Sequence, residues 1–134
     1  MADSAFAKPL GNYPLLNRSG NTLYLSGASA RLADGSMAGV TTQADGGVVC
    51  DAAVQTRVVI EKIRDLLATE GAQLSDCVEL TVYLIDMRDF AAYNAVYGEF
   101  FDSTGPARTT VAVHQLPHPH MVVEIKAVAV VPGA

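Results

Sequence analysis

The chain has 134 residues, half of them hydrophobic and 17% charged, and carries a net charge of −5 at pH 7. This length suits one domain with one hydrophobic core, which we place at residues 1–134. The acidic balance, without any run of Lys and Arg, excludes a nucleic-acid backbone as the expected partner, and no apolar run is long enough to predict a membrane span.

The apolar fraction is high for a small monomer and predicts that copies of the chain bury surface against one another. The two cysteines, Cys50 and Cys77, show neither a CxxC motif nor zinc-ligand spacing. Unpaired thiols of this kind favour a reducing compartment, so we expect a cytoplasmic protein.

The first half of the chain predicts short strands followed by a long helix. Residues 1–12 are expected to form a loose leader, and the alternating segment NTLYLSGASA predicts a strand that ends at Ser26. A further short strand is expected at residues 37–42. The helix begins after Asp51 as N-cap and ends near Gly71. Its apolar face is formed by side chains at helical spacing: Val59, Ile63, Leu66 and Leu67.

The second half predicts strand, helix, strand and strand. Residues 77–87 are β-branched and apolar, and residues 88–105 have the spacing of a second helix. Residues 108–116 and 121–131 alternate and predict two strands joined by the sequence PHPH. We therefore expect an α+β fold with one mixed sheet that carries two helices on one face. Because the other face lacks a row of charges, we expect it to pack between subunits.

Arg108 and Glu124 are the charged side chains that stand out on the last two predicted strands. An arginine at the mouth of a strand can bind a carboxylate bidentately, although a surface arginine gives the same pattern. Glu124 interrupts an apolar strand and needs a partner or a purpose, the alternative being an ion-paired face shared with Lys126. A short loop joins the two strands, so we expect them to pair antiparallel and to bring Arg108 and Glu124 towards one site.

All three histidines of the chain lie in HQLPHPH. His118 and His120 would point the same way in an extended segment, but the prolines forbid a helix and no local carboxylate supports a metal ligand. We therefore expect no bound metal. A loop whose histidine contacts an anion and a purely structural loop are equal alternatives. Tyr13 and the Ser26–Gly27 turn are likewise either ligand contacts or plain structure.

Five stretches, in chain order, resemble one known family: YLSGAS, AAVQTRVVIEKIRDLL, LTVYLIDMRDFAAYNAVYGEFF, GPARTTVAV and VEIKAVAVV. They are similar to the reactive-intermediate deaminases, also called the Rid or YjgF-like family, over roughly residues 12–131. The resemblance implies a chorismate-mutase-like fold and a homotrimer with active sites between its subunits. It also implies hydrolysis of enamines and imines to ketones and ammonia without a cofactor.

The resemblance assigns the catalytic pair to Arg108, in the motif PAR, and Glu124, in the motif VEI. The expected substrate contacts are Tyr13, Ser26, Gly27, Asn94, His118 and His120. The chain departs from the common family pattern at Ala28, where a glutamine is usual, and at Thr110, where a cysteine is frequent.

The run RTTVAVHQLPHPH followed by EIKAVA looks like the 2-aminomuconate deaminases of bacterial aromatic degradation. We therefore expect hydrolysis of 2-aminomuconate, with His118 or His120 as anchor for the second carboxylate. The alternatives are a general 2-aminoacrylate-type deaminase and a trimeric protein that binds small carboxylates without turnover. A ribonuclease fits the acidic composition poorly.

Overall fold

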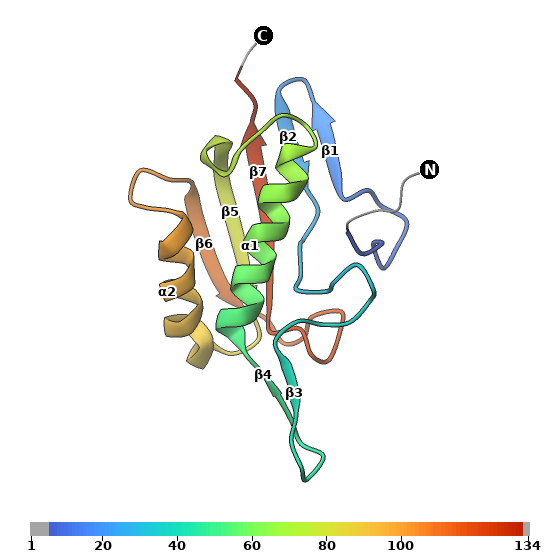
Figure 1. The fold of residues 1–134 in the computed structure, drawn as a ribbon. Coiled ribbons are helices and arrows are strands. Elements are labelled where there is room, and N and C mark those ends of the chain that lie inside the picture. The colour runs from blue at the N-terminus through green and yellow to red at the C-terminus, as the bar shows by residue number, and fades with distance from the viewer. Residues whose placement is uncertain (1–5, 133–134) are drawn as a thin grey trace.

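The alternating segments form a five-stranded mixed sheet in the computed structural model, which describes residues 6–132 (Figure 1). The strands lie in the order β1 (Leu16–Ser19), β2 (Thr22–Leu25), β7 (Val123–Val130), β5 (Cys77–Leu84) and β6 (Ala107–Ala112). Strands β5 and β6 run parallel, and the other neighbouring pairs are antiparallel. Two helices cover one face of this sheet (Figure 1), which confirms the predicted α+β architecture.

Helix α1 (Ala52–Ala68) begins where the sequence predicted, because the Asp51 side chain accepts a hydrogen bond of 3.0 Å from the Val54 amide. It ends before Gly71, whose positive φ of 73° suits a glycine after a helix. Helix α2 (Phe90–Phe100) follows a 3-10 turn at Met87–Asp89, and a second such turn, Leu74–Asp76, leads into β5.

The core lies between the two helices and the sheet. Alternate residues of β5 and β7 point towards the helices and are fully buried, among them Leu80, Val82, Leu84, Ile125 and Ala127. Burial of a valine, leucine or isoleucine side chain contributes about 1.5–3 kcal/mol. The residues between them point to the opposite face of the sheet, which carries no helix and which we call the open face.

The prediction that the last two strands of the chain pair with each other is wrong. Strand β5 lies between β6 and β7, so these two strands do not pair. Val82 of β5 lies opposite Thr110 on one side and opposite Ile125 on the other. Residues 113–122 cross the end of β5, where the Val113 amide donates 2.7 Å to the Leu84 carbonyl. A buried strand with two hydrogen-bonding edges can accept a partner on each side, and a local hairpin prediction misses this arrangement.

Several predicted boundaries move by a few residues. The strand expected over 77–87 ends at Leu84, because Asp86 accepts from the Arg88 amide and begins a 3-10 turn. The strand expected over 108–116 ends at Ala112. Strand β1 was not predicted, since its side chains are mostly exposed and do not alternate.

The remaining segments lie at the margins of the sheet. Strands β3 (Val40–Thr42) and β4 (Val48–Cys50) form a hairpin that projects from the body of the molecule (Figure 1). The expected leader begins outside the described residues, but Ala7 is buried and the Arg31 guanidinium donates to the Lys8 carbonyl. Over residues 6–132, no helix is long and apolar enough to cross a membrane.

Candidate functional site

Arg108 lies near the start of β6 and points towards the helices, because it is in register with buried Leu80. Its guanidinium carbon lies 4.7 Å from the ring centre of Tyr97 and 5.2 Å from that of Tyr93. Nη1 donates a hydrogen bond of 2.8 Å to the Asn94 side-chain oxygen. The Phe90 ring centre lies 5.8 Å from the guanidinium carbon. Three aromatic rings and one amide thus hold a half-buried guanidinium, which has five N–H donors and keeps some of them for a carboxylate.

The phenols beside Arg108 remain neutral. Burial raises the pKa of Tyr93 and of Tyr97, and the nearby positive charge of Arg108 opposes this effect less strongly. The Tyr93 hydroxyl also forms a hydrogen bond of 2.8 Å with the Thr110 hydroxyl. Thr110 therefore supports the aromatic wall on which Arg108 rests.

Glu124 lies on β7 opposite Tyr83 and points to the open face. The amides of Ala28 and Ile125 exchange hydrogen bonds of 2.8 and 3.0 Å with each other's carbonyls, which brings the Ser26–Gly27 turn beside Glu124. A Cβ atom on Gly27 would lie 2.7 Å from the carboxyl carbon of Glu124, so a larger residue at this position would displace the carboxyl group. Burial raises the pKa of the Glu124 carboxyl.

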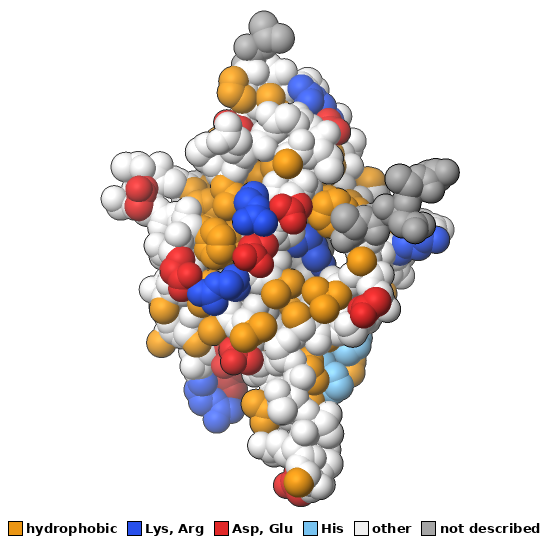
Figure 2. Space-filling view, viewed as in Figure 1, with side chains coloured by type: hydrophobic (Ala, Val, Ile, Leu, Met, Phe, Trp, Pro, Cys, Tyr) orange, Lys and Arg blue, Asp and Glu red, His pale blue; other side chains and the backbone are white. Residues whose placement is uncertain are grey.

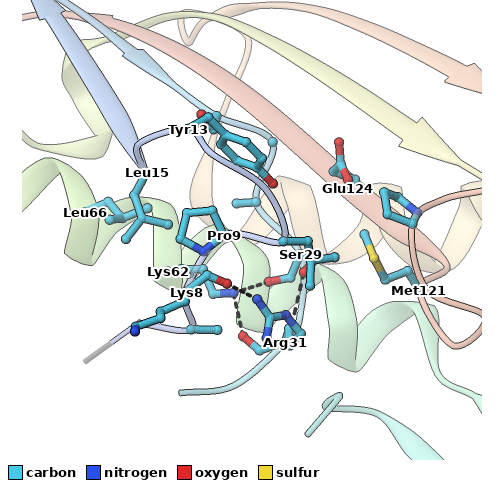
Figure 3. Close-up of a pocket in the computed structure, with 16 residues that line it drawn as sticks. Lys8, Pro9, Tyr13, Leu15, Ser29, Arg31, Lys62, Leu66, Met121 and Glu124 are labelled. Carbon is cyan, nitrogen blue, oxygen red and sulfur yellow. Dashed lines mark hydrogen bonds between the residues drawn. The ribbon is translucent and has the colours of Figure 1, made fainter. Parts of the chain in front are cut away.

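Glu124 shares a pocket with Tyr13, Ser26 and Gly27 (Figure 3). The Ser26 hydroxyl donates 2.8 Å to the Pro14 carbonyl, and this bond ties the segment that carries Tyr13 to the sheet. The enclosed volume is about 60 Å³, well below the ~300 Å³ of a small ligand pocket. One copy of the chain therefore offers a wall with a carboxylate rather than a complete binding site.

Arg108 and Glu124 do not meet within one chain. Arg108 is in register with Leu80 on the helix face, whereas Glu124 is in register with Tyr83 on the open face. Three residues along the strand and two strand spacings separate them, which corresponds to about 14 Å between Cα atoms at 3.3 Å per residue and 4.8 Å per strand. The expected approach of the two residues across one strand pair is therefore wrong, for the reason that β5 separates the strands.

The histidines lie in the loop that crosses the end of β5. His114 and His118 line a cavity of about 360 Å³, whereas the lining does not include His120. The His120 amide donates 3.0 Å to Nδ1 of His118, and the two rings make an edge contact with centres 5.4 Å apart. Within residues 6–132, no three His, Cys, Asp or Glu side chains gather in a way that would hold a metal ion.

Gln55 and Lys62 on α1 support these loops, and sequence reasoning did not select them. Gln55 is fully buried and donates 3.1 Å to the Ala38 carbonyl and 2.8 Å to the His120 carbonyl, while its oxygen accepts 3.0 Å from the Val122 amide. Gln55 lies four residues before Val59 on the apolar face of the helix. A polar residue on such a face indicates a buried side chain with hydrogen-bond partners, and this pattern could have identified Gln55 from the sequence.

Lys62 holds the segment after the Ser26–Gly27 turn. Its ammonium donates to the Ser29 carbonyl and, at 2.6 Å, to the Arg31 carbonyl (Figure 3). Burial, with a smaller effect of the Arg31 charge, lowers the pKa of Lys62 to about 8. Both contacts lie at the base of the pocket that contains Glu124.

The family model described as Endoribonuclease L-PSP matches residues 4–131. The chain is 37% identical over 122 residues to a RutC family protein of Pyrococcus horikoshii, covering 91% of this chain and 89% of that protein. It is 34% identical over 124 residues to the 2-iminobutanoate/2-iminopropanoate deaminase of Dermatophagoides farinae, covering 92% and 89% of the two chains. The crystal structure of Escherichia coli TdcF with bound serine has a TM-score of 0.78 at 27% identity and covers 96% of this chain and 94% of that one. The chain therefore belongs to the Endoribonuclease L-PSP family, also called the Rid or YjgF-like family.

Proposed function

We propose that the protein hydrolyses enamines and imines of 2-amino acids to 2-oxo acids and ammonia, without a cofactor. The relative from Dermatophagoides farinae is named for this chemistry, and the TdcF structure holds an amino acid. The family description names an endoribonuclease, but a net charge of −5 without a basic stripe opposes binding of RNA phosphates. The charge of the chain therefore favours a deaminase over a ribonuclease.

The observation that carries the proposal is the separation of Arg108 and Glu124 onto opposite faces of one sheet. A substrate that needs both residues can bind only where the helix-face edge of one copy meets the open face of another. The open face has exposed apolar side chains, with Tyr24 at 45%, Val111 at 38% and Val130 at 43% of full exposure, which suits burial between copies. The proposed assembly is a homotrimer with one site at each interface.

The proposed roles follow from the chemistry of each group. Arg108, held by Asn94, binds the carboxylate next to the reacting carbon through paired N–H donors. The enamine takes a proton at carbon to become an imine, and water then adds to the imine carbon. The C–N bond breaks, and the nitrogen leaves as ammonia after gaining a proton.

Glu124 is the proposed proton relay in both steps. Burial raises the pKa of its carboxyl, which favours a group that must both accept and donate a proton near neutral pH. The close approach of Gly27 fixes the carboxyl, and the Ser26 hydroxyl, Tyr13 and the backbone of the turn surround the reacting nitrogen. Two unpaired cysteines, Cys50 and Cys77, support a cytoplasmic setting.

Within this class we propose 2-aminomuconate as the substrate, on the basis of the resemblance carried by RTTVAVHQLPHPH. A general deaminase for 2-aminoacrylate and a carboxylate-binding protein without turnover are the competing functions. The test is a coupled ammonia assay with 2-aminomuconate and 2-aminoacrylate in parallel. Faster release from 2-aminomuconate supports the proposal, whereas faster release from 2-aminoacrylate favours the general deaminase.

The Arg108→Ala variant tests the site itself. We expect loss of turnover with an unchanged circular dichroism spectrum, because Arg108 is half exposed and lies outside the core. The matched control is Arg64→Ala, which removes an exposed arginine of α1 that pairs only with neighbouring Asp65 among the described residues. Full activity of Arg108→Ala would reject the assignment, and binding of carboxylates without any ammonia release would favour the non-catalytic function.

A further inference from the structure

The loop at residues 113–122 is held in a defined shape by the rest of the fold. Gln55 binds two backbone groups of the loop, the His120 carbonyl at 2.8 Å and the Val122 amide at 3.0 Å. Because Gln55 is fully buried, these bonds are shielded from competing water. The Met121 amide donates a further bond of 3.1 Å to the His118 carbonyl. A loop fixed in this way can present side chains to a ligand without a large ordering cost.

The loop and Ile85 enclose the cavity of about 360 Å³ that His114 and His118 line. Its other walls are mainly apolar and include Leu116 and Met121. Among the described residues, no aspartate or glutamate lines the cavity, so no negatively charged side chain there would repel an anion. Figure 2 shows histidine side chains at the surface beside hydrophobic ones, so a ligand can reach this part of the molecule from solvent.

The hydrogen bonding of His118 sets which ring atom is left for a ligand. Its Nδ1 accepts the His120 amide, so the proton of the neutral ring lies on Nε2. The group that the ring can offer is therefore a hydrogen-bond donor. The side chains of His114 and Gln115 also line the cavity, between walls that are mainly apolar. A carboxylate is a ligand group that accepts hydrogen bonds from N–H donors of this kind.

The cavity adjoins the pocket of Glu124. Pro117 and Met121 line both spaces, which places the two spaces side by side along one apolar wall. In Figure 3, Met121 lies close to Glu124. A flat unsaturated carbon chain can lie along this apolar wall, and the polarisable sulfur of methionine suits such a contact.

We infer that this cavity, with Nε2 of His118 as donor, binds the remote carboxylate of an elongated unsaturated dicarboxylic acid whose reacting end lies at Glu124. The inference rests on the proposed function for the position of the reacting end. A three-carbon substrate such as 2-aminoacrylate has no second carboxylate and gains nothing from His118. His120 acts as a positioning residue, since its amide fixes the His118 ring and its carbonyl binds Gln55.

The test compares two stable probes, trans,trans-muconate and sorbate, which share one diene chain and differ in one terminal carboxylate. Calorimetric titration of the wild-type protein should show tighter binding of muconate by ~10–100-fold, the value of one hydrogen bond to a charged group. His118→Leu should weaken muconate binding to the level of sorbate and leave sorbate binding unchanged. His118→Gln, which keeps an N–H donor, should recover part of the difference.

The inference is overturned if the wild-type protein binds the two probes equally or binds neither at millimolar concentration. It is also overturned if His118→Leu weakens both probes to the same extent, which indicates a structural role. Thermal melting of each variant checks the fold, and the comparison of probes on the wild-type protein does not depend on any variant. Ammonia release from 2-aminoacrylate is measured separately, so that loss of the subsite and loss of the proposed reaction are told apart.

Discussion

Replacement of Gly27 by alanine should impair the reaction while the fold remains intact. The added Cβ would lie 2.7 Å from the carboxyl carbon of Glu124 and 3.1 Å from its Cγ. Because Oε2 of Glu124 would lie closer still, the carboxyl group must move by about 1 Å to reach an ordinary contact of 3.4 Å. Because displacements near 1 Å of a reacting group cost on the order of 10²-fold in rate, we expect kcat to fall by ~10–100-fold.

The expected effect on stability is small. Gly27 is exposed and has no positive φ, and the crowded atoms belong to the end of a flexible side chain. We therefore expect the free energy of unfolding to change by about 1 kcal/mol or less, measured by urea denaturation. The assay is steady-state ammonia release with the best substrate found.

A matched control is Gly47→Ala, in the turn between β3 and β4. There the new Cβ would also crowd side-chain oxygens, those of Asp45 at 3.0 Å and Gln43 at 3.1 Å, but in an exposed hairpin away from Glu124. We expect this variant to retain wild-type kcat. Full activity of Gly27→Ala, or an equal loss in both variants, would refute the reasoning about Glu124.

Three further predictions concern Arg108, Glu124 and Tyr93. Arg108→Lys keeps the charge but loses the paired donors, so kcat/KM in steady-state assays should fall by ~10–100-fold, and an unchanged value would contradict a bidentate role. Burial raises the pKa of Glu124, so kcat/KM should rise with pH, with a midpoint above the ordinary pKa of 4.5, and a midpoint at or below 4.5 would argue against this role. Because the folded state favours the neutral carboxyl, the wild type should also lose stability relative to Glu124→Gln as the pH rises from 4.5 through the raised pKa. Tyr93→Phe removes the hydrogen bond of 2.8 Å to Thr110 and should lower the free energy of unfolding by about 1 kcal/mol. If the lost bond is the cause, adding Thr110→Val to the Tyr93→Phe variant should produce a much smaller further loss.

Much of the fold follows from local sequence patterns. Helix α1 was predicted from its apolar spacing and from Asp51, and the structure confirms both the face and the cap. The burial of alternate residues in β5 and β7 agrees with their period. The resemblance to a chorismate-mutase-like α+β fold is likewise confirmed by the mixed sheet and by the solved relative.

The order of strands could not be predicted in the same way. The alternating pattern of β6 and β7 gives the face of each residue but not the neighbour of each strand, because pairing depends on long-range contacts. The short loop between them suggested a hairpin, whereas β5 lies between the two strands. With β5 between them, Arg108 and Glu124 lie two strands apart and cannot meet across one strand pair, and local sequence patterns do not reveal this separation.

The supporting side chains were also difficult to find from sequence. Gln55 and Lys62 act on backbone carbonyls and amides far along the chain, such as those at His120 and Arg31. Such partners leave no residue-type pattern, because every residue carries the same backbone groups. Only the polarity of Gln55 on an apolar helix face pointed to such a role.

The central claim is that a working site combines Arg108 of one copy with Glu124 of another. Arg108→Ala and Glu124→Gln chains with different affinity tags are co-expressed, and oligomers that contain both are isolated by two successive affinity steps. In a ring of three chains, any mixed composition contains one interface with both intact residues, so the mixture should recover about one third of wild-type activity per chain. Mixed oligomers that are as inactive as each variant alone would contradict a site shared between copies.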